Sequence, residues 1–521
     1  MRKWWPLVAI CLGTFMLLMD VTIVNVALPA ISYDLRASIS ALQWVMDAYA
    51  LVLAALLLTA GACADLLGRR RMYLTGLTVF AAASLVCGLA PSAGALVVGR
   101  ALQGLGGAIM FATTTALLTS VYSGRERVVA FSAWGAVSGS ATATGPVLGG
   151  LLSQRWGWPT IFLVNLPVAV LTMALARRVL PEYKSAAGRR FDAPGAVTFT
   201  VAAGAVVAGL ISSSEKGRDD DGVLALLALG GVALLLFLVV ELSSAQPMLD
   251  LRLFRRPAFS GLMLSALLLQ GTAFGHLGYT SLWLQSSLHM QPLAAGLVLA
   301  PLSLSGLLVS SLGGRFLQGL PARVPVSCGL LLIGIGVLSQ AMVGPHSGWT
   351  ALLPGLVLTG IGAGGMIPPL TAAALASVPQ SEAGTASGAV NTFRQLGQAI
   401  GVAVLGSVFV HAAGPSLDHV TDNPLRAAAA VGSGQSDRFI DAAAPNRRGV
   451  VADAVHAAFV SGLQQVFLIA GSAAVVTGIA AWFLLKDLDR DRTPAAAEGA
   501  STGASNRGPE PPFAAGTVTP P

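Results

Sequence analysis

The segment Gly61-Ala-Cys-Ala-Asp65-Leu-Leu-Gly68-Arg69-Arg70-Arg71 joins two long apolar runs, at about 42–63 and 72–90. Each run is long enough to cross the hydrocarbon core of a bilayer, which takes about 20 apolar residues in a helix. Gly68 permits a tight turn, and three successive arginines are typical of a loop on the cytoplasmic side of a membrane. Asp65 can pair with an arginine or cap the next helix. The segment therefore predicts two membrane helices joined by a short basic turn.

The composition of the whole chain points to the same environment. The 521 residues are 54% hydrophobic and only 11% charged, whereas a soluble protein carries about 25% charged residues. The net charge of +7 does not indicate a nucleic-acid partner, because the basic residues lie in short loops between apolar runs. The four cysteines have no metal-ligand spacing, and no phosphate-binding or catalytic motif is readable. We therefore expect a membrane protein that is not an enzyme, with no metal and no cofactor.

Apolar runs of membrane-spanning length recur along the chain, and their length without two-residue alternation favours helices over strands. The fourteen runs are approximately 7–30, 42–63, 72–90, 95–120, 129–152, 159–177, 194–212, 222–242, 259–284, 293–316, 325–343, 350–373, 386–412 and 459–485. The first run is too long for the apolar part of a signal peptide, so we expect a retained helix.

The distribution of lysine and arginine predicts the orientation. With the N-terminus in the cytoplasm, 21 of the 31 basic residues fall on the cytoplasmic side, as the positive-inside rule requires. Both termini are then cytoplasmic. We expect a polar outer loop at 413–457 and a disordered Pro- and Ala-rich cytoplasmic tail at 487–521.

A weak internal repeat divides the chain. The first copy of the repeat consists of Gly61, Asp65, Gly68 and Arg70. A weaker second copy follows 253 residues later and consists of Gly314, Gln318, Pro321 and Arg323. In the second copy a glutamine replaces the acid. Internal repeats are the usual construction of secondary transporters. The predicted units are a six-helix bundle at 1–190, a two-helix insert at 191–245 and a six-helix bundle at 246–486.

The first run contains a carboxylate at membrane depth. Asp20 lies 15 residues beyond Trp5, which is roughly 22 Å along a helix. An acid at that depth costs at least about 2.5 kcal/mol and normally faces a cavity or a partner. A medium of low dielectric disfavours the charged form of a carboxyl group, which suits reversible protonation. The alternative is a structural carboxylate bonded to Thr22, Asn25 or a neighbouring helix.

Two further runs carry polar or small residues at helical spacing. Arg100, Gln103, Gly104 and Gly107 share one helix face, where the guanidinium can influence a nearby carboxylate or tether two helices. In the fifth run, two glycine pairs are spaced for close helix packing and a proline can bend the helix. The second pair and its neighbours are Gly145, Pro146, Gly149 and Gly150.

Together these segments resemble the major facilitator superfamily, and specifically its fourteen-helix drug:proton antiporters of the EmrB/QacA type. The segment 20–29 is similar to the first-helix motif of that family, 61–71 to motif A, 100–107 to motif B and 145–150 to the antiporter motif C. The resemblance implies that Asp20 and Arg100 take part in proton coupling. It also implies that Asp65 with Arg69 and Arg70 gates the cytoplasmic side. The glutamine in the second copy of motif A departs from the pattern and implies a weaker latch there.

Other polar residues fall within apolar runs and are candidates for lining a substrate cavity, although each is also compatible with simple packing. They are Thr22 and Asn25 in the first run, Gln270, His276, Tyr279 and Trp283 in the ninth, and Asn391, Arg394, Gln395 and Gln398 in the thirteenth. The last four share one face and also suit a gate or hydrogen bonds between helices.

The sequence thus predicts an exporter of amphipathic drugs or small metabolites in the bacterial inner membrane, coupled to protons and working by alternating access. The alternatives are a proton-linked uptake symporter of the same fold, a passive channel and a membrane-embedded enzyme. The expected partners are a small amphipathic substrate and the lipid bilayer. We expect a monomer, and association with accessory export proteins is left open.

Overall fold

The computed structural model describes residues 2–37, 39–182, 192–216, 220–244, 247, 249–316, 320–378, 383–432 and 434–486, without the side chains of a few helical residues inside these ranges. Within this part of the chain the structure is all-helical and has no strand. Helices are suited to crossing a membrane, because an α-helix satisfies its backbone N–H and C=O groups within the segment where no water is present to bond them.

The helices follow one another with short connections. The first part of the chain forms α1 (Trp5–Asp34), α2 (Ile39–Leu67), α3 (Arg69–Gly88), α4 (Ala93–Val121), α5 (Gly124–Trp156), α6 (Thr160–Leu163) and α7 (Asn165–Val179). Then come α8 (Ala193–Lys216), α9 (Asp221–Ser243) and the short helix η2 (Leu251–Arg255). The remainder forms α10 (Pro257–Phe274), α11 (Leu277–Ser286), α12 (Pro292–Phe316), α13 (Arg323–Gln340), η3 (Trp349–Leu352), α14 (Leu353–Ala376), α15 (Ala383–Ala413), η5 (Gly414–Leu417), α16 (Pro424–Gly432), α17 (Ser436–Asp441) and α18 (Arg448–Leu484).

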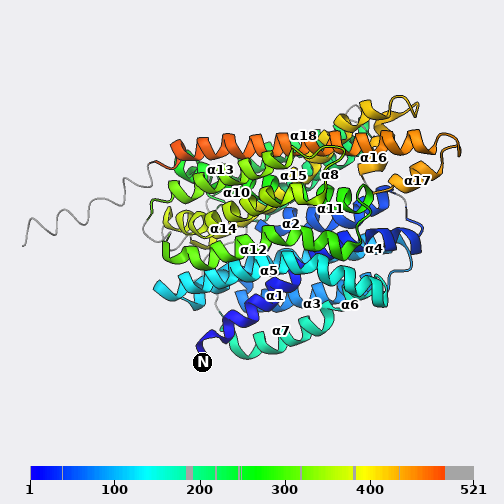
Figure 1. Cartoon of the computed structure of the whole chain (residues 1–521). Coiled ribbons are helices and arrows are strands. Elements are labelled where there is room, and N and C mark those ends of the chain that lie inside the picture. Colours follow the sequence, from blue (N-terminus) through cyan, green and yellow to red (C-terminus); the bar gives the residue numbers. More distant parts are fainter. Residues whose placement is uncertain are drawn as a thin grey trace, which may run out of the picture.

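Thirteen spans within the described residues are long and apolar enough to cross a membrane, and each matches one predicted run. The one run without such a span is the fifth, 129–152, which falls in α5, a helix of 33 residues that packs against α1 and α12. Both the N-terminus and the C-terminal end of α18 lie at the same end of the bundle (Figure 1). That arrangement calls for an even number of crossings; the count of fourteen and the cytoplasmic orientation stay predictions.

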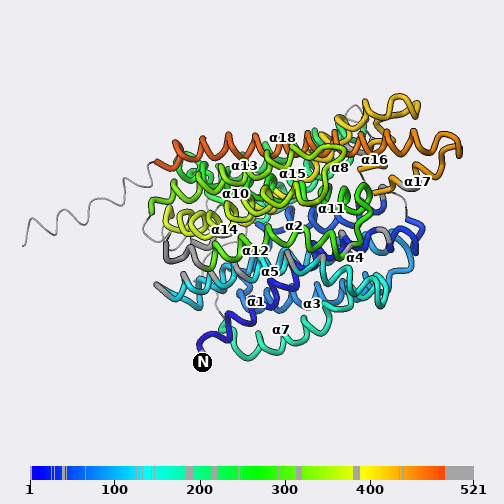
Figure 2. The backbone as a smooth tube through the Cα atoms, viewed as in Figure 1, coloured from blue at the N-terminus to red at the C-terminus, as the bar shows by residue number. Residues whose placement is uncertain are grey.

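The helices form two bundles side by side, as the colours of Figure 2 show. One bundle contains α1 to α7 and the other α10 to α18. They meet along two seams, where α5 packs against α12 and α2 packs against α15. The inserted helix α8 packs against both α2 and α15, and α9 packs on α8. The insert therefore lies over one of the two seams between the bundles.

Two predicted runs are broken in the structure. The run 159–177 divides into α6 and α7 at Val164, since Pro167 has no N–H to donate to the carbonyl of Leu163. The run 259–284 divides into α10 and α11 at Gly275 and His276. The first interruption lies beside Asn165 and the second contains His276, and both of these polar side chains are buried.

The segment 413–457, expected as a polar loop, is largely helical. It contains η5, α16 and α17, and α18 begins at Arg448 rather than near residue 459. The short helix α16 buries Ala427, Ala428 and Val431 against α15 and α18. This amphipathic pattern folds the segment onto the end of the second bundle. The predicted tail at 487–521 lies outside the described residues.

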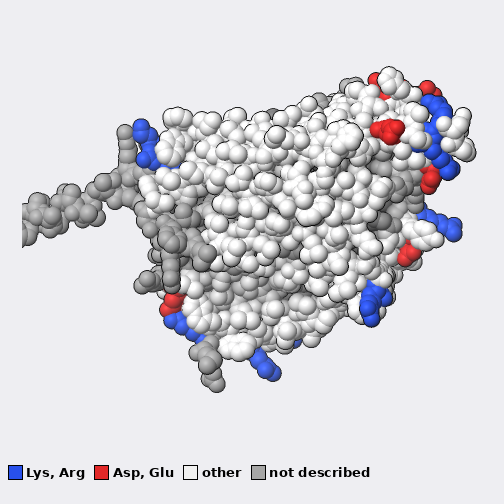
Figure 3. Space-filling view, viewed as in Figure 1, with Lys and Arg blue, Asp and Glu red and all other residues white. Residues whose placement is uncertain are grey.

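Charged side chains gather at the two ends of the molecule. Between them, the visible face is a broad belt without lysine, arginine, aspartate or glutamate (Figure 3). Large apolar side chains such as Leu235, Val239 and Phe483 are exposed on the protein surface. An exposed apolar belt of this extent is what a lipid-facing surface requires.

Candidate functional site

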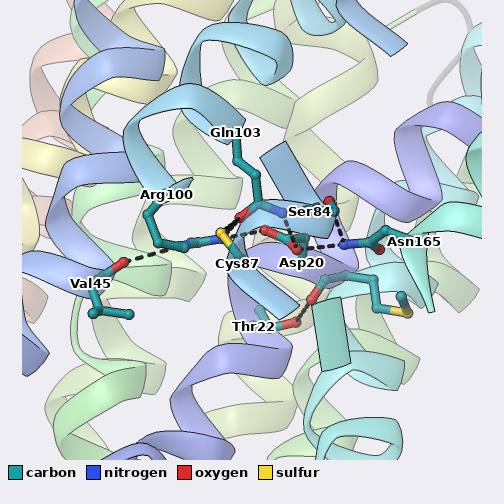
Figure 4. A network of polar contacts seen from close by, with 9 residues as sticks. Asp20, Thr22, Val45, Ser84, Cys87, Arg100, Gln103 and Asn165 are labelled. Carbon is teal, nitrogen blue, oxygen red and sulfur yellow. Dashed lines mark hydrogen bonds and ion pairs between the residues drawn. The ribbon is translucent and has the colours of Figure 1, made fainter. Parts of the chain in front are cut away.

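Asp20 lies in the middle of α1 and is fully buried, with none of its side chain exposed. Its Oδ2 atom accepts from Nη1 of Arg100 at 2.5 Å. Its Oδ1 atom accepts from Nε2 of Gln103 at 3.2 Å and from Nδ2 of Asn165 at 2.8 Å. Figure 4 shows these donors converging on the carboxylate from α4 and α7. The structure thus brings Asp20 together with Arg100 and Gln103, the two polar residues that helical spacing places on one face of α4.

A second set of contacts fixes these donors. Nε of Arg100 donates to the carbonyl of Val45 at 3.0 Å, and the guanidinium lies 4.4 Å from the centre of the Tyr49 ring. The hydroxyl of Ser84 accepts from Gln103 at 2.8 Å and from Asn165 at 3.4 Å. The network therefore draws on α1, α2, α3, α4 and α7 of one bundle (Figure 4).

The arrangement suits a charged Asp20 opposite a charged Arg100. Three N–H groups point at the carboxylate, and each is satisfied only while an oxygen lone pair faces it. A proton on Asp20 would cancel the charge that balances the guanidinium and displace at least one donor. Leaving one member of a buried pair uncompensated costs about 3–5 kcal/mol. Protonation of Asp20 would therefore strain the packing of several helices at once.

Asn165 and Ser84 belong to this site, and the sequence analysis did not select them. Asn165 is the first residue of α7, beside the interruption at Val164, and its side chain is fully buried. The available signal was an amide inside an apolar run close to a proline. Ser84 gives a weaker signal, because serine is common in membrane helices.

The basic turn after α2 is held by contacts within the first bundle. Nη1 of Arg69 donates to the carbonyl of Ala116 at 2.9 Å, and Nη2 of Arg70 donates to the carbonyl of Arg177 at 2.5 Å. Glu182 accepts from the backbone N–H of Arg70 at 3.2 Å and lies 3.8 Å from Nε of Arg71. Glu182 is a further partner that the sequence analysis did not select.

Gly68 occupies a backbone conformation with φ of +105° between α2 and α3, and an added Cβ would meet the carboxylate of Glu182. Glycine is the residue that adopts such a φ without strain. Gly61 closes the other end of the motif, near Ala112 of α4. The side chain of Asp65 lies outside the described residues, so its role in the gate stays a prediction.

The glycines of the fourth and fifth runs mark close helix contacts. A Cβ on Gly104 would lie 2.6 Å from the carbonyl of Tyr49, and one on Gly107 would lie 3.0 Å from its hydroxyl. On α5, a Cβ on Gly149 would lie 2.8 Å from the carbonyl of Ile23, and one on Gly150 would lie 3.2 Å from the N atom of Leu293. Motif B thus holds α4 against α2, and motif C holds α5 against α1 and against α12 of the other bundle.

Thr22 lies beside this contact. Its hydroxyl donates to the carbonyl of Met19 within α1 at 3.1 Å, and Gly145 of α5 packs on the threonine side chain. The structure therefore places Thr22 at the contact between α1 and α5 rather than on Asp20. The side chains of Asn25 and Pro146 lie outside the described residues.

Three of the polar residues predicted in the second bundle form a chain of contacts between α10 and α15. Nη2 of Arg394 donates to Oε1 of Gln270 at 3.3 Å, and Nε2 of Gln270 donates to Oε1 of Gln398 at 3.3 Å. Asn391, one turn earlier on α15, donates to the hydroxyl of Thr115 on α4 at 3.4 Å. Gln395 is partly exposed beside them. This face of α15 is therefore turned toward the first bundle.

His276, Tyr279 and Trp283 lie deeper within the second bundle. The ring of His276 meets Phe467 edge-on at 5.3 Å, and the ring of Tyr279 stacks on Phe409 at 5.4 Å. His276 and Trp283 are almost completely buried. These three residues pack among apolar side chains, and only Gln270 of the ninth run joins the polar contacts of α15.

Comparison with known proteins bears on the whole chain. Residues 10–402 match the family model of the Major Facilitator Superfamily. The chain is 34% identical to the Multidrug resistance protein Stp of Mycobacterium tuberculosis, with 91% of each chain covered. It is 31% identical to the Tetracenomycin C resistance and export protein of Streptomyces glaucescens, covering 95% of this chain and 94% of that protein. It is also 36% identical to the Puromycin resistance protein pur8 of Streptomyces alboniger, covering 81% and 84%.

The fold has a close counterpart among solved structures. The crystal structure of the human organic anion transporter MFSD10 (TETRAN) superimposes with a TM-score of 0.61 over 93% of this chain and 99% of that one, at 17% identity. The predicted all-helical major-facilitator fold is thereby confirmed. The chain belongs to the Major Facilitator Superfamily and is a multi-pass membrane transporter rather than an enzyme.

Proposed function

We propose that this protein exports amphipathic drugs or small metabolites across the bacterial inner membrane in exchange for protons, by alternating access of the two bundles. The observation that carries the proposal is the buried carboxylate of Asp20, held by Arg100, Gln103 and Asn165 in the bundle interior. The relatives supply the direction and the class of substrate, since their names describe drug resistance and antibiotic export.

The coupling follows from the charge balance of the network. In the present arrangement Asp20 and Arg100 neutralise each other, and Arg100 is also tied to α2 through Val45. A proton arriving from outside weakens the pair and frees α1 and α4 to shift relative to each other. That shift reaches the other bundle through α5, which packs on α1 by Gly145 and Gly149 and on α12 by Gly150. Loss of the proton to the cytoplasm restores the pair and resets the transporter.

The test is Asp20→Asn, which keeps the size of the side chain and removes the titratable group. A susceptibility screen of an overexpressing strain, with puromycin among the compounds, first identifies a substrate. Everted vesicles then report proton movement when that substrate is added. We expect the variant to lose the substrate-evoked proton signal and the accumulation driven by a proton gradient.

Asp34→Asn is the matched control, because Asp34 lies on the same helix but is exposed and accepts only from Nε1 of Trp158. It should transport as the unaltered protein does. Full proton movement in Asp20→Asn would remove Asp20 from the coupling. Movement of proton and substrate in the same direction would instead indicate an uptake symporter.

A further inference from the structure

Arg394 is a cation on α15 of the second bundle, far from either end of that helix. It lies 11 residues from the start of α15 at Ala383, or roughly 16 Å along the helix. A guanidinium at such depth needs a partner of opposite charge or a polar surrounding. The other intramembrane arginine, Arg100, has the carboxylate of Asp20 as its partner. Arg394 has no equivalent.

The contacts of Arg394 within the described residues satisfy little of its donor capacity. One nitrogen, Nη2, donates to Oε1 of Gln270 at a long distance of 3.3 Å. Nε is buried and has no acceptor. Gln270 and Gln398 are neutral amides, and the amide nitrogen of Gln398 also donates to nothing in the described part of the chain. Several N–H groups of this cluster therefore remain available to an acceptor that the protein does not supply.

Three of the helices around this cluster carry no negative charge. The helices α4, α10 and α15, which border this cluster, contain no aspartate and no glutamate. Among the described residues, no acidic side chain pairs with Arg394. The cluster is thus a region of uncompensated positive charge at membrane depth, where low dielectric strengthens attraction for an anion.

The position of the cluster also fits a substrate path. Asn391 lies one turn before Arg394 on α15 and contacts Thr115 of α4 across the two bundles. Residues three apart share a helix face, so Arg394 faces the region between the bundles rather than lipid. The residue as a whole is partly exposed, although Nε of its side chain is buried.

We propose that Arg394, with the amides of Gln270 and Gln398, is a subsite for an anionic group of the exported substrate, such as a carboxylate or an ionised phenol on an aromatic framework. Within this cluster the amide oxygens already accept hydrogen bonds, so the N–H groups of Arg394 and of Gln398 are the donors left for such a group, and the pairing supplies the missing countercharge. This assignment rests on the proposed export function and narrows its substrate class to weak acids and other organic anions.

A labelling experiment tests the subsite without a known substrate. The four native cysteines are replaced by alanine, and Gln395→Cys places a partly exposed thiol next to Arg394 while leaving the three side chains of the subsite intact. The protein is reconstituted in phosphatidylcholine nanodiscs and treated with sulfonatoethyl methanethiosulfonate, which is anionic, or trimethylammonioethyl methanethiosulfonate, which is cationic. We expect a preference for the anionic reagent that falls at least about tenfold in Arg394→Gln. Fluorescein, an aromatic anion, should protect the thiol, whereas rhodamine 6G, a cation of the same ring system, should not.

Two variants separate charge from folding. Arg394→Lys should keep most of the anionic preference, because it keeps the charge. Arg252→Gln removes an exposed arginine of η2 in the same half and should leave the preference unchanged. An unreactive thiol, equal behaviour of Arg394→Gln and Arg394→Lys, or protection by rhodamine 6G as strong as by fluorescein would each overturn the subsite.

The source of the anion is distinguished by lipid composition. Phosphatidylglycerol added to the nanodiscs supplies an anionic headgroup, and protection by this lipid without protection by fluorescein would assign the site to lipid and overturn the proposal. The labelling does not depend on transport or on Asp20. If the labelling fails while export still depends on Asp20, only the subsite proposal is overturned. If the labelling succeeds while export does not depend on Asp20, only the coupling proposal is overturned.

Discussion

Asp20 illustrates how one carboxylate can organise several membrane helices. Arg100 and Gln103 reach it from α4, and Asn165 reaches it from α7, so that three N–H groups share two oxygens. Hydrogen bonds to a charged group are shorter and stronger than neutral ones, and in a dry interior each missing partner is costly. The stability of the first bundle and the chemistry of the site therefore depend on the same atoms.

Asn165 offers a test of this dependence at the scale of one residue. In Asn165→Ala, Oδ1 of Asp20 loses its shortest bond, at 2.8 Å, and the hydroxyl of Ser84 loses a donor. We expect a loss of about 1–3 kcal/mol in the free energy of unfolding, measured by thermal unfolding in detergent, together with slower substrate export.

The control is Thr172→Ala on the same helix. Thr172 is fully buried, but its hydroxyl donates only to the carbonyl of Val168 one turn earlier in α7. Among the described residues it makes no hydrogen bond to another helix, so its removal breaks none. If both variants lost equal stability and equal export, the hydrogen bond from Asn165 to Asp20 would have no specific effect on either.

Particular residues show how far the sequence predicts the site. Arg100 and Gln103 are found from helical spacing, whereas the family resemblance alone links Arg100 to Asp20. Asn165, Ser84 and Glu182 are not found, because their roles depend on which helices become neighbours. No spacing within one helix carries that information. His276 and Trp283 look like lining residues in sequence, yet tertiary packing buries them.

At the scale of elements, glycines determine how close the helices approach. The α1–α5 contact is the clearest case, because α5 presents Gly145 and Gly149 to the backbone and side chains of α1. Small residues are what allow such an approach in a membrane, where packing replaces the hydrophobic effect as the main attraction.

Gly149→Ala should therefore destabilise the protein although alanine favours helices. Its Cβ would lie 2.8 Å from the carbonyl of Ile23, so α1 and α5 must separate, at a cost of about 1–3 kcal/mol. Gly231→Ala on α9 is the control, since nothing lies within 4 Å of its Cβ position. That variant should be neutral or gain up to about 1 kcal/mol. Thermal unfolding of both variants measures the difference. Equal stability of the two variants would mean that α1 and α5 are not in close contact at Gly149.

Element boundaries show the limits of hydropathy. Most apolar runs appear as helices near the predicted positions, because the thickness of the bilayer sets their length. Hydropathy does not register the break at Val164 or the break at Gly275, where backbone geometry rather than polarity interrupts the helix. It also overlooks the alanine-rich helix α16 and the helix α17, because both are too short to resemble a span.

At the scale of the molecule, the two bundles and the insert make different kinds of contact. Between α2 and α8, the hydroxyls of Thr59 and Thr200 lie 3.3 Å apart, and Thr200 donates to the carbonyl of Ala55. Between α8 and α15, the contact consists of Val207 with Ala399 and Ala403. Polar bonds on one side and small apolar residues on the other suggest that α8 moves with the first bundle and slides on α15.

Paired cysteines test this division. A disulfide between Thr59→Cys and Thr200→Cys, in a background without native cysteines, should form readily and leave export nearly unchanged. A disulfide between Thr115→Cys and Asn391→Cys, whose native side chains lie 3.4 Å apart, joins α4 to α15 and should abolish export until it is reduced. Export that survives the second link would exclude relative motion of the bundles at this point.

The placement of α8 also has a consequence for biosynthesis. The insert stands between the two halves in the chain as well as in space, so the ribosome completes it before any helix of the second bundle. At about 5–20 residues per second, α15 emerges roughly 10 to 40 seconds after α8. By then α2 already carries α8 along one side. This seam therefore closes when α15 packs against α2 and α8 together. In a chain without the insert, the side of α15 that packs on α8 would face lipid.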